Sequence, residues 1–476
     1  MGQDLPVLIQ GGMGVAVSDW RLAGAVSAAG HLGVVSGTAL DVVLVRRLQL
    51  GDPGGHVRRA LDALPMRGAA EGILDRYYIP GGKQSDQRFK MSSIRREKPS
   101  RNLEDLIIAG NFVEVFLAKE GHDGPVGINF LEKIQSPTLP SLYGAMLAGV
   151  DFVLMGAGIP RTMPAVLNNL AEGRSVDMRL DVRGATKDDD FKTEFDPAAA
   201  MGEHLAPVKR PKFLAIVSSH VLAIMLATKI DVPVDGFIVE APTAGGHNAP
   251  PRGKLQLTDG GEPIYGARDV PDFGVIADLG LPFWLAGGNA DPKRITEALD
   301  LGATGVQVGT AFAFCEESGF DPEVKRQVIE MARSGDARVF TDPLASPSGF
   351  PFKVVQLDGT LSNDDVYTSR ERQKCDLGFL RTAYKGSDGK FTWRCPSEPV
   401  AVFLRKGGSV EEVEGRKCLC NSLLANVGLG QIQEDGNPEP MLITSGDEIS
   451  QISRFIPDGA DTYTARDVIN FLLPGS

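Results

Sequence analysis

Short apolar segments, each ended by glycine, proline or a polar residue, recur along the chain between residues 6 and 314. Eight of them are rich in Val, Ile and Phe, which is typical of parallel strands that are buried on both faces. The eight segments are Pro6–Met13, Leu32–Thr38, Pro125–Leu131, Asp151–Gly158, Phe213–Ser219, Gly236–Pro242, Pro282–Asn289 and Gly305–Phe314.

Most of these segments precede a stretch with the spacing of an amphipathic helix. After the first strand, Ser18 is positioned to cap a helix over Asp19–Ala29, whose apolar residues fall on one face. After the fifth, seventh and eighth strands, helices are predicted over His220–Lys229, Lys293–Leu301 and Asp321–Ser334. Alternating strands and helices predict a parallel sheet, and eight such units favour a closed (β/α)8 TIM barrel. An open, doubly wound sheet is the alternative, because periodicity alone does not reveal closure.

Three parts of the chain do not fit the eight units. Two are insertions over about residues 39–124 and 171–211, and the third is a cysteine-containing C-terminal extension over residues 339–476. The barrel is therefore expected within residues 1–338. The first insertion contains a basic segment, Lys83–Arg101, which would suit an acidic protein partner or a phosphate, or would form a solvated loop.

The overall composition is that of a globular protein that can bury a large core. Hydrophobic residues make up 42% of the 476 residues and charged residues 23%. The 49 Lys and Arg against 61 Asp and Glu give a net charge of −12, which argues against nucleic acid as the main partner. No apolar run approaches the roughly 20 residues of a membrane span, and no basic start is followed by a signal-type apolar segment. We therefore expect a cytoplasmic protein without a membrane partner.

Glycines stand where the seventh and eighth strands end. The seventh strand runs into Gly287 and Gly288, and the eighth contains Gly309 followed by Thr310. A (β/α)8 barrel often binds a phosphate at this place, because glycine allows close approach of backbone N–H groups and the next helix adds a favourable dipole. Two such turns predict a phosphate site, although each alone also fits a tight turn.

The first and third strands end in further candidates for ligand binding. Gly11, Gly12 and Met13 would let the backbone pass close to a flat ligand, or would form a flexible turn. Asn129 would point its amide into the barrel mouth, or would serve as an ordinary turn residue.

One histidine stands directly after a glycine pair at the end of the sixth strand. His247 follows Gly245 and Gly246, where it would face a substrate in the barrel mouth. An imidazole that titrates near neutrality suits general-base catalysis on a carbon acid. The alternatives are a solvated loop residue and a helix cap.

Together, these motifs resemble the nitronate monooxygenase (2-nitropropane dioxygenase) family. The resemblance spans roughly residues 5–335 and rests on four motifs in the family's order and spacing: Gln10–Gly14 with Gly30–Gly33, Ala244–His247, Ala286–Gly288 and Gln307–Phe312. It implies an FMN over the barrel mouth, with its phosphate after the seventh and eighth strands. The implied cofactor-binding residues are Gly11, Gly12, Met13, Asn129, Gly245, Gly246, Gly287, Gly288, Gly309 and Thr310.

The resemblance also implies a reaction. His247 would take the α-proton of a nitronate-like carbon acid, after which flavin and O2 would complete its oxidation to a carbonyl compound and nitrite. The same barrel serves flavin-dependent enoyl-acyl-carrier-protein reductases, which reduce a C=C bond with NAD(P)H, and this activity with an acyl carrier protein as partner is the alternative. A non-catalytic flavin-binding module is a third interpretation, against which the placement of His247 argues. Self-association into a homodimer is left open.

The chain departs from the family's pattern in two places. Relatives usually continue Gly-Gly-His-x-Gly, whereas here His247 is followed by Asn248–Gly253, which contains two adjacent prolines. The long extension is also absent from compact members of the family. Both departures bear on the identity of the substrate, not on flavin binding.

Four of the five cysteines lie in the extension. Cys375, Cys395, Cys418 and Cys420 predict four thiolate ligands for zinc or for an iron–sulfur cluster, or else reduced structural thiols. Their spacing matches no common zinc finger. The fifth, Cys315, follows the eighth strand and is expected to pack in the barrel wall.

Overall fold

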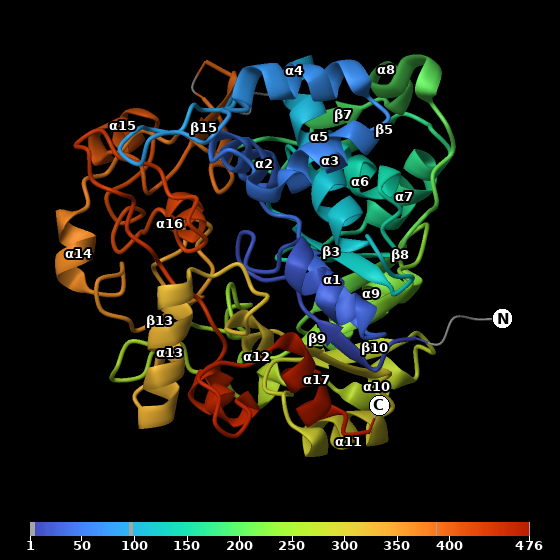
Figure 1. Ribbon diagram of the computed structural model, residues 1–476, viewed down its shortest axis with the longest axis vertical. Coiled ribbons are helices and arrows are strands. Elements are labelled where there is room, and N and C mark those ends of the chain that lie inside the picture. The colour runs from blue at the N-terminus through green and yellow to red at the C-terminus, as the bar shows by residue number, and fades with distance from the viewer. Residues whose placement is uncertain (1–4, 95–98, 387, 476) are drawn as a thin grey trace.

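The chain folds around a closed barrel of eight parallel strands (Figure 1), which confirms the predicted (β/α)8 architecture. The computed structural model describes residues 5–94, 99–386 and 388–475. The barrel closes because β1 pairs with both β2 and β11, which excludes the open sheet. Around the barrel, the strands follow the order β1 (Leu8–Gln10), β11 (Gly305–Val308), β10 (Phe283–Ala286), β9 (Gly236–Glu240), β8 (Lys212–Val217), β4 (Phe152–Gly156), β3 (Val126–Leu131) and β2 (Leu32–Ser36).

Apolar side chains fill the inside of the barrel. They form a cluster of their own, made of Ile9, Leu32, Val34, Phe152, Leu154, Leu214, Ile238, Trp284 and Ala286. The indole N–H of Trp284 donates to the carbonyl of Pro6 at 2.7 Å. The barrel is thus a packed core, and any ligand must bind at a rim and not within it.

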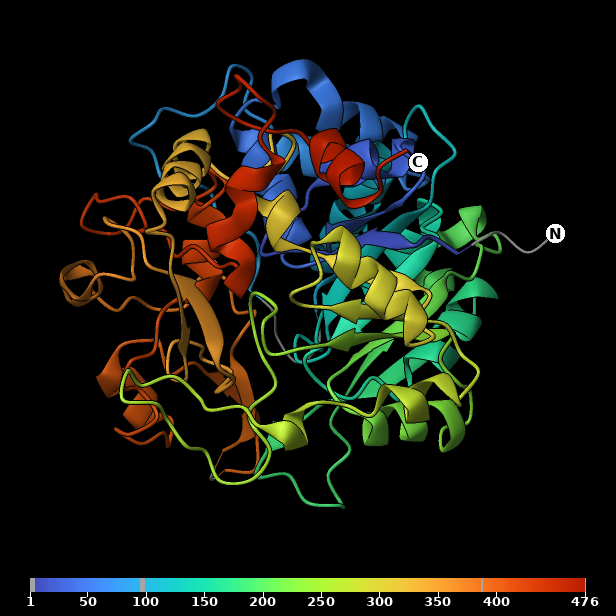
Figure 2. The ribbon, with the colours of Figure 1, turned by 90° about the horizontal axis from the view of Figure 1, so that it is seen from below.

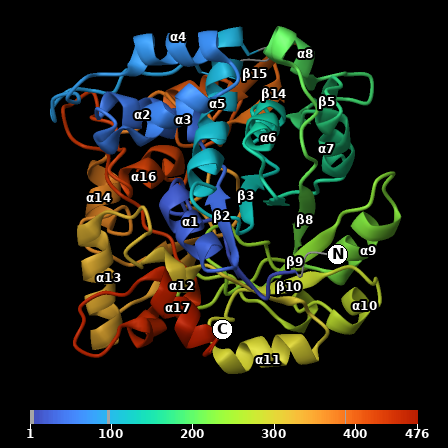
Figure 3. The same cartoon turned by 45° about the vertical axis from the view of Figure 1, so that its right-hand side comes forward.

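Helices surround the strands on the outside, as Figure 3 shows. They are α1 (Trp20–Ala28), α6 (Thr138–Leu147), α7 (Met163–Ala171), α9 (His220–Thr228), α10 (Phe273–Ala277), α11 (Pro292–Asp300), α12 (Thr310–Ala313) and α13 (Pro322–Ser334). The helices predicted after the first, fifth, seventh and eighth strands are confirmed, each within one residue at either end.

Two details of the prediction are wrong. The carboxylate of Asp19 caps α1 by accepting from the amide of Arg21, whereas the Ser18 hydroxyl accepts from the amide of Met13 at 2.9 Å and so braces the loop after β1. The eighth strand ends at Val308, because the chain turns at Gly309 into the short helix α12, whose amides at Phe312 and Ala313 donate to the carbonyl of Gly309.

The two insertions add helices and a small sheet. The first contains α2 (Leu40–Gln49), η1 (Pro53–Gly55), α3 (His56–Ala63), α4 (Arg67–Tyr77) and α5 (Arg101–Ala118). The second contains β5 (Val176–Arg179), β6 (Val182–Arg183), β7 (Lys192–Phe195), α8 (Pro197–Met201) and η2 (Gly202–His204). A further turn of helix, η3 (Ala267–Asp269), precedes α10.

The basic segment of the first insertion packs against the extension. The backbone amide of Phe89 donates to the side chain of Gln431 at 2.8 Å, and the Gln431 amide group donates back to the carbonyl of Phe89 at 3.1 Å. Arg95, Arg96 and Lys98 lie outside the described residues. The binding of an acidic partner by this segment stays a prediction.

The C-terminal extension lies along one side of the barrel in Figure 2, where it is orange to red. Its elements are β12 (Val339–Asp342), β13 (Phe352–Val355), α14 (Asp364–Ser369), β14 (Thr382–Lys385), β15 (Phe391–Arg394), α15 (Val400–Arg405), α16 (Leu419–Ala425), η4 (Asp447–Phe455) and α17 (Ala465–Leu472). Strand β14 pairs with β6, so the extension and the second insertion share a sheet. The last helix, α17, returns to contact α1 and α11.

Among the described residues, none of the helices combines the length and the apolar character needed to cross a membrane. Residues 1–4 lie outside the described part of the chain, and the cytoplasmic location stays a prediction.

Candidate active site

A cavity opens at the C-terminal ends of the barrel strands, where enzymes with this fold carry their active sites. It holds about 1490 Å³ of space free of protein atoms, part of it open to solvent. Every residue predicted from the sequence to bind cofactor or to act as base lines this cavity: Gly11, Gly12, Met13, Asn129, Gly245, Gly246, His247, Gly287, Gly288, Gly309 and Thr310. The extension adds Phe352, Phe379, Leu380, Cys420, Leu423, Thr444, Ser445, Gly446 and Glu448, so it forms a wall of the cavity.

The glycines after β10 occupy backbone conformations that other residues rarely adopt. Gly287 and Gly288 have φ angles of +86° and +74°. A Cβ atom on Gly287 would also lie 2.9 Å from the backbone nitrogen of Ala244. Any other residue here would therefore strain the turn and collide with the loop after β9.

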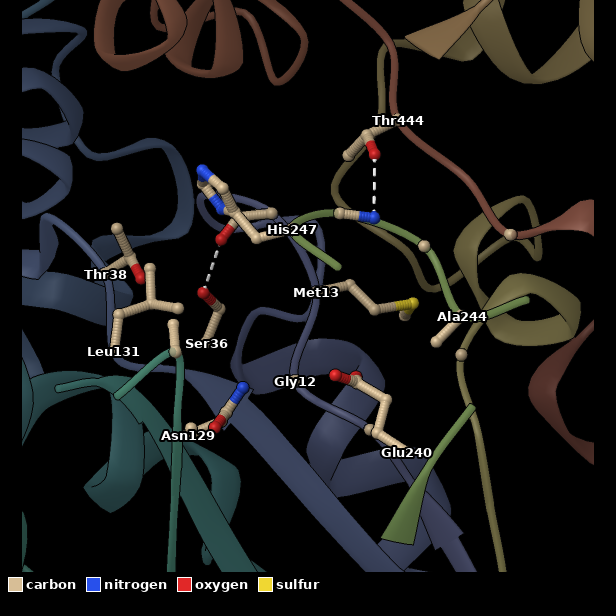
Figure 4. Close-up of a pocket in the computed structure, with 18 of the residues that line it drawn as sticks. Gly12, Met13, Ser36, Thr38, Asn129, Leu131, Glu240, Ala244, His247 and Thr444 are labelled. Carbon is tan, nitrogen blue, oxygen red and sulfur yellow. Dashed lines mark hydrogen bonds between the residues drawn. The ribbon is translucent and has the colours of Figure 1, made fainter. Parts of the chain in front are cut away.

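Gly12 is needed for a close approach between two strand ends. A Cβ atom at this position would lie 2.6 Å from Cβ of Asn129. Figure 4 shows Asn129 and Glu240 on opposite sides of the Gly12 segment, with His247 above them. The three polar side chains therefore converge on one space from β3, β9 and the loop after β9.

His247 is held in place by the extension. The Ser346 hydroxyl lies 2.7 Å from Nε2 of His247, and the Phe352 ring meets the imidazole edge-on with centroids 4.8 Å apart. Burial, with a smaller contribution from the positive charge of Lys133, lowers the pKa of His247 to about 4. The imidazole is therefore neutral at physiological pH, as a general base must be.

The loop that carries His247 is clamped between two segments of the extension. On one side, the amide of Lys353 donates to the carbonyl of Gly246 at 3.0 Å. On the other side, the amide of Gly246 donates to the Thr444 hydroxyl at 3.0 Å, which Figure 4 marks with a dashed line. A Cβ on Gly245 would lie 2.8 Å from the backbone nitrogen of Gly446, so these two backbones touch.

Glu240, the last residue of β9, is a second perturbed ionisable group in the cavity. Burial raises the pKa of its carboxyl to about 7. No role is predicted for this residue from the sequence, although a carboxylate at the C-terminal end of a barrel strand is itself a signal for a site residue. Perturbed acids and bases in one cavity are typical of catalytic sites.

Three buried polar atoms of the cavity wall have no hydrogen-bond partner among the described residues. They are Oδ1 of Asn129, Oε1 of Gln307 and Oγ of Ser445. Buried polar atoms are nearly always paired, so unpaired atoms that line a cavity point to a polar ligand there. The Thr310 hydroxyl, in contrast, accepts from the amide of Gly446 at 2.9 Å.

A second cavity adjoins the first. It holds about 930 Å³ and shares Ile134, Phe379 and Leu380 with the first cavity. Its charged lining residues are Lys133, Arg381 and Asp181, so positive charge is in excess. Burial lowers the pKa of Lys133 to about 8, against the raising effect of Glu132 and Asp181.

The cysteine predictions have two outcomes. Cys315 is fully buried behind α12, as expected. Among the residues that the structure describes, no three His, Cys, Asp or Glu side chains are arranged to hold a metal ion. The structure therefore does not support the predicted zinc ion or iron–sulfur cluster at Cys375, Cys395, Cys418 and Cys420, and of the alternatives it favours reduced thiols.

Part of the chain is similar to nitronate monooxygenases. Residues 203–347 match the family model of nitronate monooxygenase. A probable nitronate monooxygenase of Bacillus subtilis (strain 168) is 35% identical over 108 residues, which are 23% of this chain and 29% of that protein. The (3aS,4S,5R,7aS)-5-hydroxy-7a-methyl-1-oxo-octahydro-1H-indene-4-carboxyl-CoA dehydrogenase of Mycobacterium tuberculosis is 26% identical over 213 residues, covering 44% of this chain and 53% of that one.

Among solved structures, FabK from Thermotoga maritima covers 99% of this chain and 92% of its own, at 16% identity and a TM-score of 0.49. The chain spans under a third of the length of the Bacillus relative and about half of the length of the Mycobacterium relative. The family model and the Bacillus relative confirm the resemblance to nitronate monooxygenases that the motifs indicate.

Proposed function

We propose that this chain is an FMN-dependent oxidoreductase in which His247 removes a proton from a nitronate-like carbon acid. The observation that carries the proposal is a half-buried imidazole with a pKa of about 4 in the same cavity as the left-handed glycine turn at Gly287 and Gly288. The match of residues 203–347 to the nitronate monooxygenase family supports it, because this range contains His247, Gly287 and Gly288.

The residues of the cavity fit an FMN. Gly287, Gly288, Gly309 and Thr310 offer a glycine-lined turn and a hydroxyl at the position where barrels of this kind bind phosphate. The unpaired Asn129 and Gln307 oxygens on the wall of the cavity can accept from a polar ring edge.

The protein's own part in the reaction is to place and protect the base. Because burial and Lys133 keep His247 neutral, it can accept a proton without first losing one. Ser346 and Phe352 fix the orientation of the ring, and the apolar side chains of Phe352, Phe379 and Leu423 limit the access of water. FMN, when bound, supplies an electron acceptor that O2 can reoxidise.

Reduction of an enoyl thioester with NAD(P)H is the second candidate. The observation that favours it is the adjoining cavity, whose Lys133 and Arg381 side chains suit the phosphates of a carrier-linked or CoA-linked substrate. The Mycobacterium relative, which is named for a CoA thioester, gives the same indication. An acyl carrier protein as partner and a homodimer stay predictions.

Anaerobic flavin reduction separates the two candidates. The purified protein is mixed with an alkyl nitronate and, separately, with NADPH or NADH, and flavin absorbance is followed. Bleaching by the nitronate alone supports the monooxygenase proposal. Bleaching by the pyridine nucleotide alone supports the enoyl reductase, with acyl thioesters as the next substrates. Failure to bind FMN even after reconstitution would refute both.

A further inference from the structure

A turn of the extension holds two serines beside the candidate base. Residues 346–349, Ser-Pro-Ser-Gly, form a β-turn between β12 and β13, in which the amide of Gly349 donates to the carbonyl of Ser346 at 3.0 Å. Proline suits the second position of such a turn because its ring fixes φ. The guanidinium of Arg416 also donates to the Ser346 carbonyl, at 2.6 Å. These contacts hold the two serines in place.

The side chains of this turn continue the hydrogen bond of His247. Its Nε2 atom lies 2.7 Å from the hydroxyl oxygen of Ser346, which lies 2.8 Å from the hydroxyl oxygen of Ser348. Ser346 is fully buried, whereas Ser348 is half-buried. The three side chains thus form an unbroken chain of hydrogen-bonding groups that leads away from the imidazole.

This chain joins the two adjoining cavities. His247 lines the large cavity, Ser348 lines the second cavity, and Ser346 links the two side chains. Part of the second cavity, which holds about 930 Å³, is open to solvent. A proton that leaves Ser348 can therefore reach water without crossing the cavity in which a substrate would bind.

The hydrogen-bonding capacity of Ser346 couples its two side-chain bonds. A hydroxyl donates one hydrogen bond and accepts two. One acceptor position of Ser346 is taken by the backbone amide of Ser348, at 3.2 Å. Ser346 can then accept from His247 and donate to the Ser348 hydroxyl, or it can accept from that hydroxyl and donate to His247. The first arrangement changes into the second when one proton moves along the chain and leaves it at Ser348.

The first arrangement is the one that suits a base. When Nε2 of a neutral imidazole carries the proton, Nδ1 has a free lone pair. No described residue makes a hydrogen bond to Nδ1 of His247, whereas Nε2 is engaged by Ser346. Nδ1 is therefore the nitrogen that is left for the proton of a substrate.

We propose that Ser346 and Ser348 form a proton relay that returns His247 to its neutral state while a substrate occupies the large cavity. The inference rests on the proposed function, in which His247 removes a proton from a carbon acid. Nδ1 takes the proton, the electron pair of the broken C–H bond stays on the substrate, and Nε2 gives its own proton to Ser346. Ser346 passes its hydroxyl proton to Ser348, and Ser348 releases its proton to water in the second cavity.

The surroundings of the imidazole favour this transfer. Burial, with a smaller contribution from Lys133, lowers the pKa of His247 to about 4, so a protonated ring is costly. Removal of the substrate proton is easier when a second proton leaves the ring in the same step. Lys133 and Arg381 outnumber Asp181 on the wall of the second cavity, so the released proton passes on to solvent. After the product leaves, Nδ1 loses its proton to water in the large cavity and a proton returns along the chain.

Anaerobic flavin reduction by two forms of one substrate tests the relay. A neutral nitroalkane has to lose a proton before it gives electrons to the flavin, whereas its pre-ionised nitronate has already lost that proton. The ratio of the two rates therefore reports proton removal alone. General-base catalysis is worth roughly 100-fold or more, and since Ser348→Ala leaves the base in place, we expect this ratio to fall about tenfold. Ser348→Thr, which keeps a hydroxyl, should restore it.

Deuterated solvent provides a second measurement. Serine hydroxyl protons exchange with D2O, whereas a freshly dissolved nitroalkane keeps its carbon-bound proton. The wild type should therefore react with the nitroalkane more slowly in D2O, and Ser348→Ala should lose this difference. Ser334→Ala, which removes an exposed hydroxyl at the end of α13, is the control and should behave as the wild type in both measurements.

The outcomes separate the relay from the proposed reaction. A ratio of rates that is unchanged in Ser348→Ala, a ratio that Ser348→Thr does not restore, or a solvent isotope effect that persists in Ser348→Ala would overturn the relay alone. A wild type that oxidises the nitronate but not the nitroalkane would also overturn it, because no proton would have to be removed. A flavin that neither compound reduces would show that the proposed reaction itself is wrong, and the relay with it.

Discussion

The raised pKa of Glu240 has a measurable consequence for stability. Its carboxyl has a pKa of about 7 in the fold, against an ordinary value of 4.5. At about 1.4 kcal/mol per pH unit, this difference corresponds to roughly 3 kcal/mol. Between pH 4.5 and pH 7 the folded protein holds a proton that the unfolded chain has released, so this group lowers stability as pH rises through that window.

Glu240→Gln removes this titration while keeping the shape of the side chain. We expect the unfolding free energy of the variant, relative to that of the wild type, to rise by about 3 kcal/mol as the pH increases from 4.5 to 8. His247 acts in the opposite direction, because its lowered pKa makes stability rise with pH from about 4 to 6.5. The two effects partly cancel in the wild type. In the variant, the unfolding free energy should therefore rise with pH, because only the contribution of His247 remains.

Urea unfolding of flavin-free protein, followed by circular dichroism at several pH values, checks the prediction. Glu71→Gln, at an exposed position on α4, is the control and should match the wild type at every pH. A stability difference between Glu240→Gln and the wild type that stays constant across the pH range would refute the burial argument.

Three other substitutions test the site and the extension. His247→Ala should keep FMN but lose most turnover, because the base is gone; flavin content and steady-state rates check this, and unchanged turnover would exclude the assigned role. Gly245→Ala would place a Cβ 2.8 Å from the backbone nitrogen of Gly446 and should weaken FMN binding several-fold in a fluorescence titration; unchanged affinity would contradict it. Arg370→Met would leave the buried Glu439 carboxylate without its cation and should lower the unfolding free energy by about 3–5 kcal/mol in urea; a loss below 1 kcal/mol would argue against it.

The barrel was largely predictable from the sequence because its signals are local. Each strand is a short apolar run, and parallel strands need a helix between them, so the alternation itself predicts the architecture. The glycine turns at Gly287 and Gly309 and the pair before His247 could be placed in one cavity for the same reason, since all strands of a barrel end at the same rim.

The predictions that failed depended on contacts between distant segments. Ser18 was an acceptable cap by residue type, but its hydroxyl is engaged by Met13, and Asp19 takes its place. Residues 310–313 were predicted to belong to the eighth strand because they are apolar, but they form α12, which packs against η4 of the extension. Apolar character indicates burial without indicating which backbone conformation is buried.

The alternation of strands and helices, and the positions of the glycines and of His247 at strand ends, are properties of the local sequence, because each depends on residues within one βα unit. The lowered pKa of His247 and the raised pKa of Glu240 are properties of the folded chain. They arise from burial and from charges such as Lys133, which are contributed by segments that are far apart in sequence. No pattern along the chain reports such distances, and only the packing of the extension on the barrel sets them.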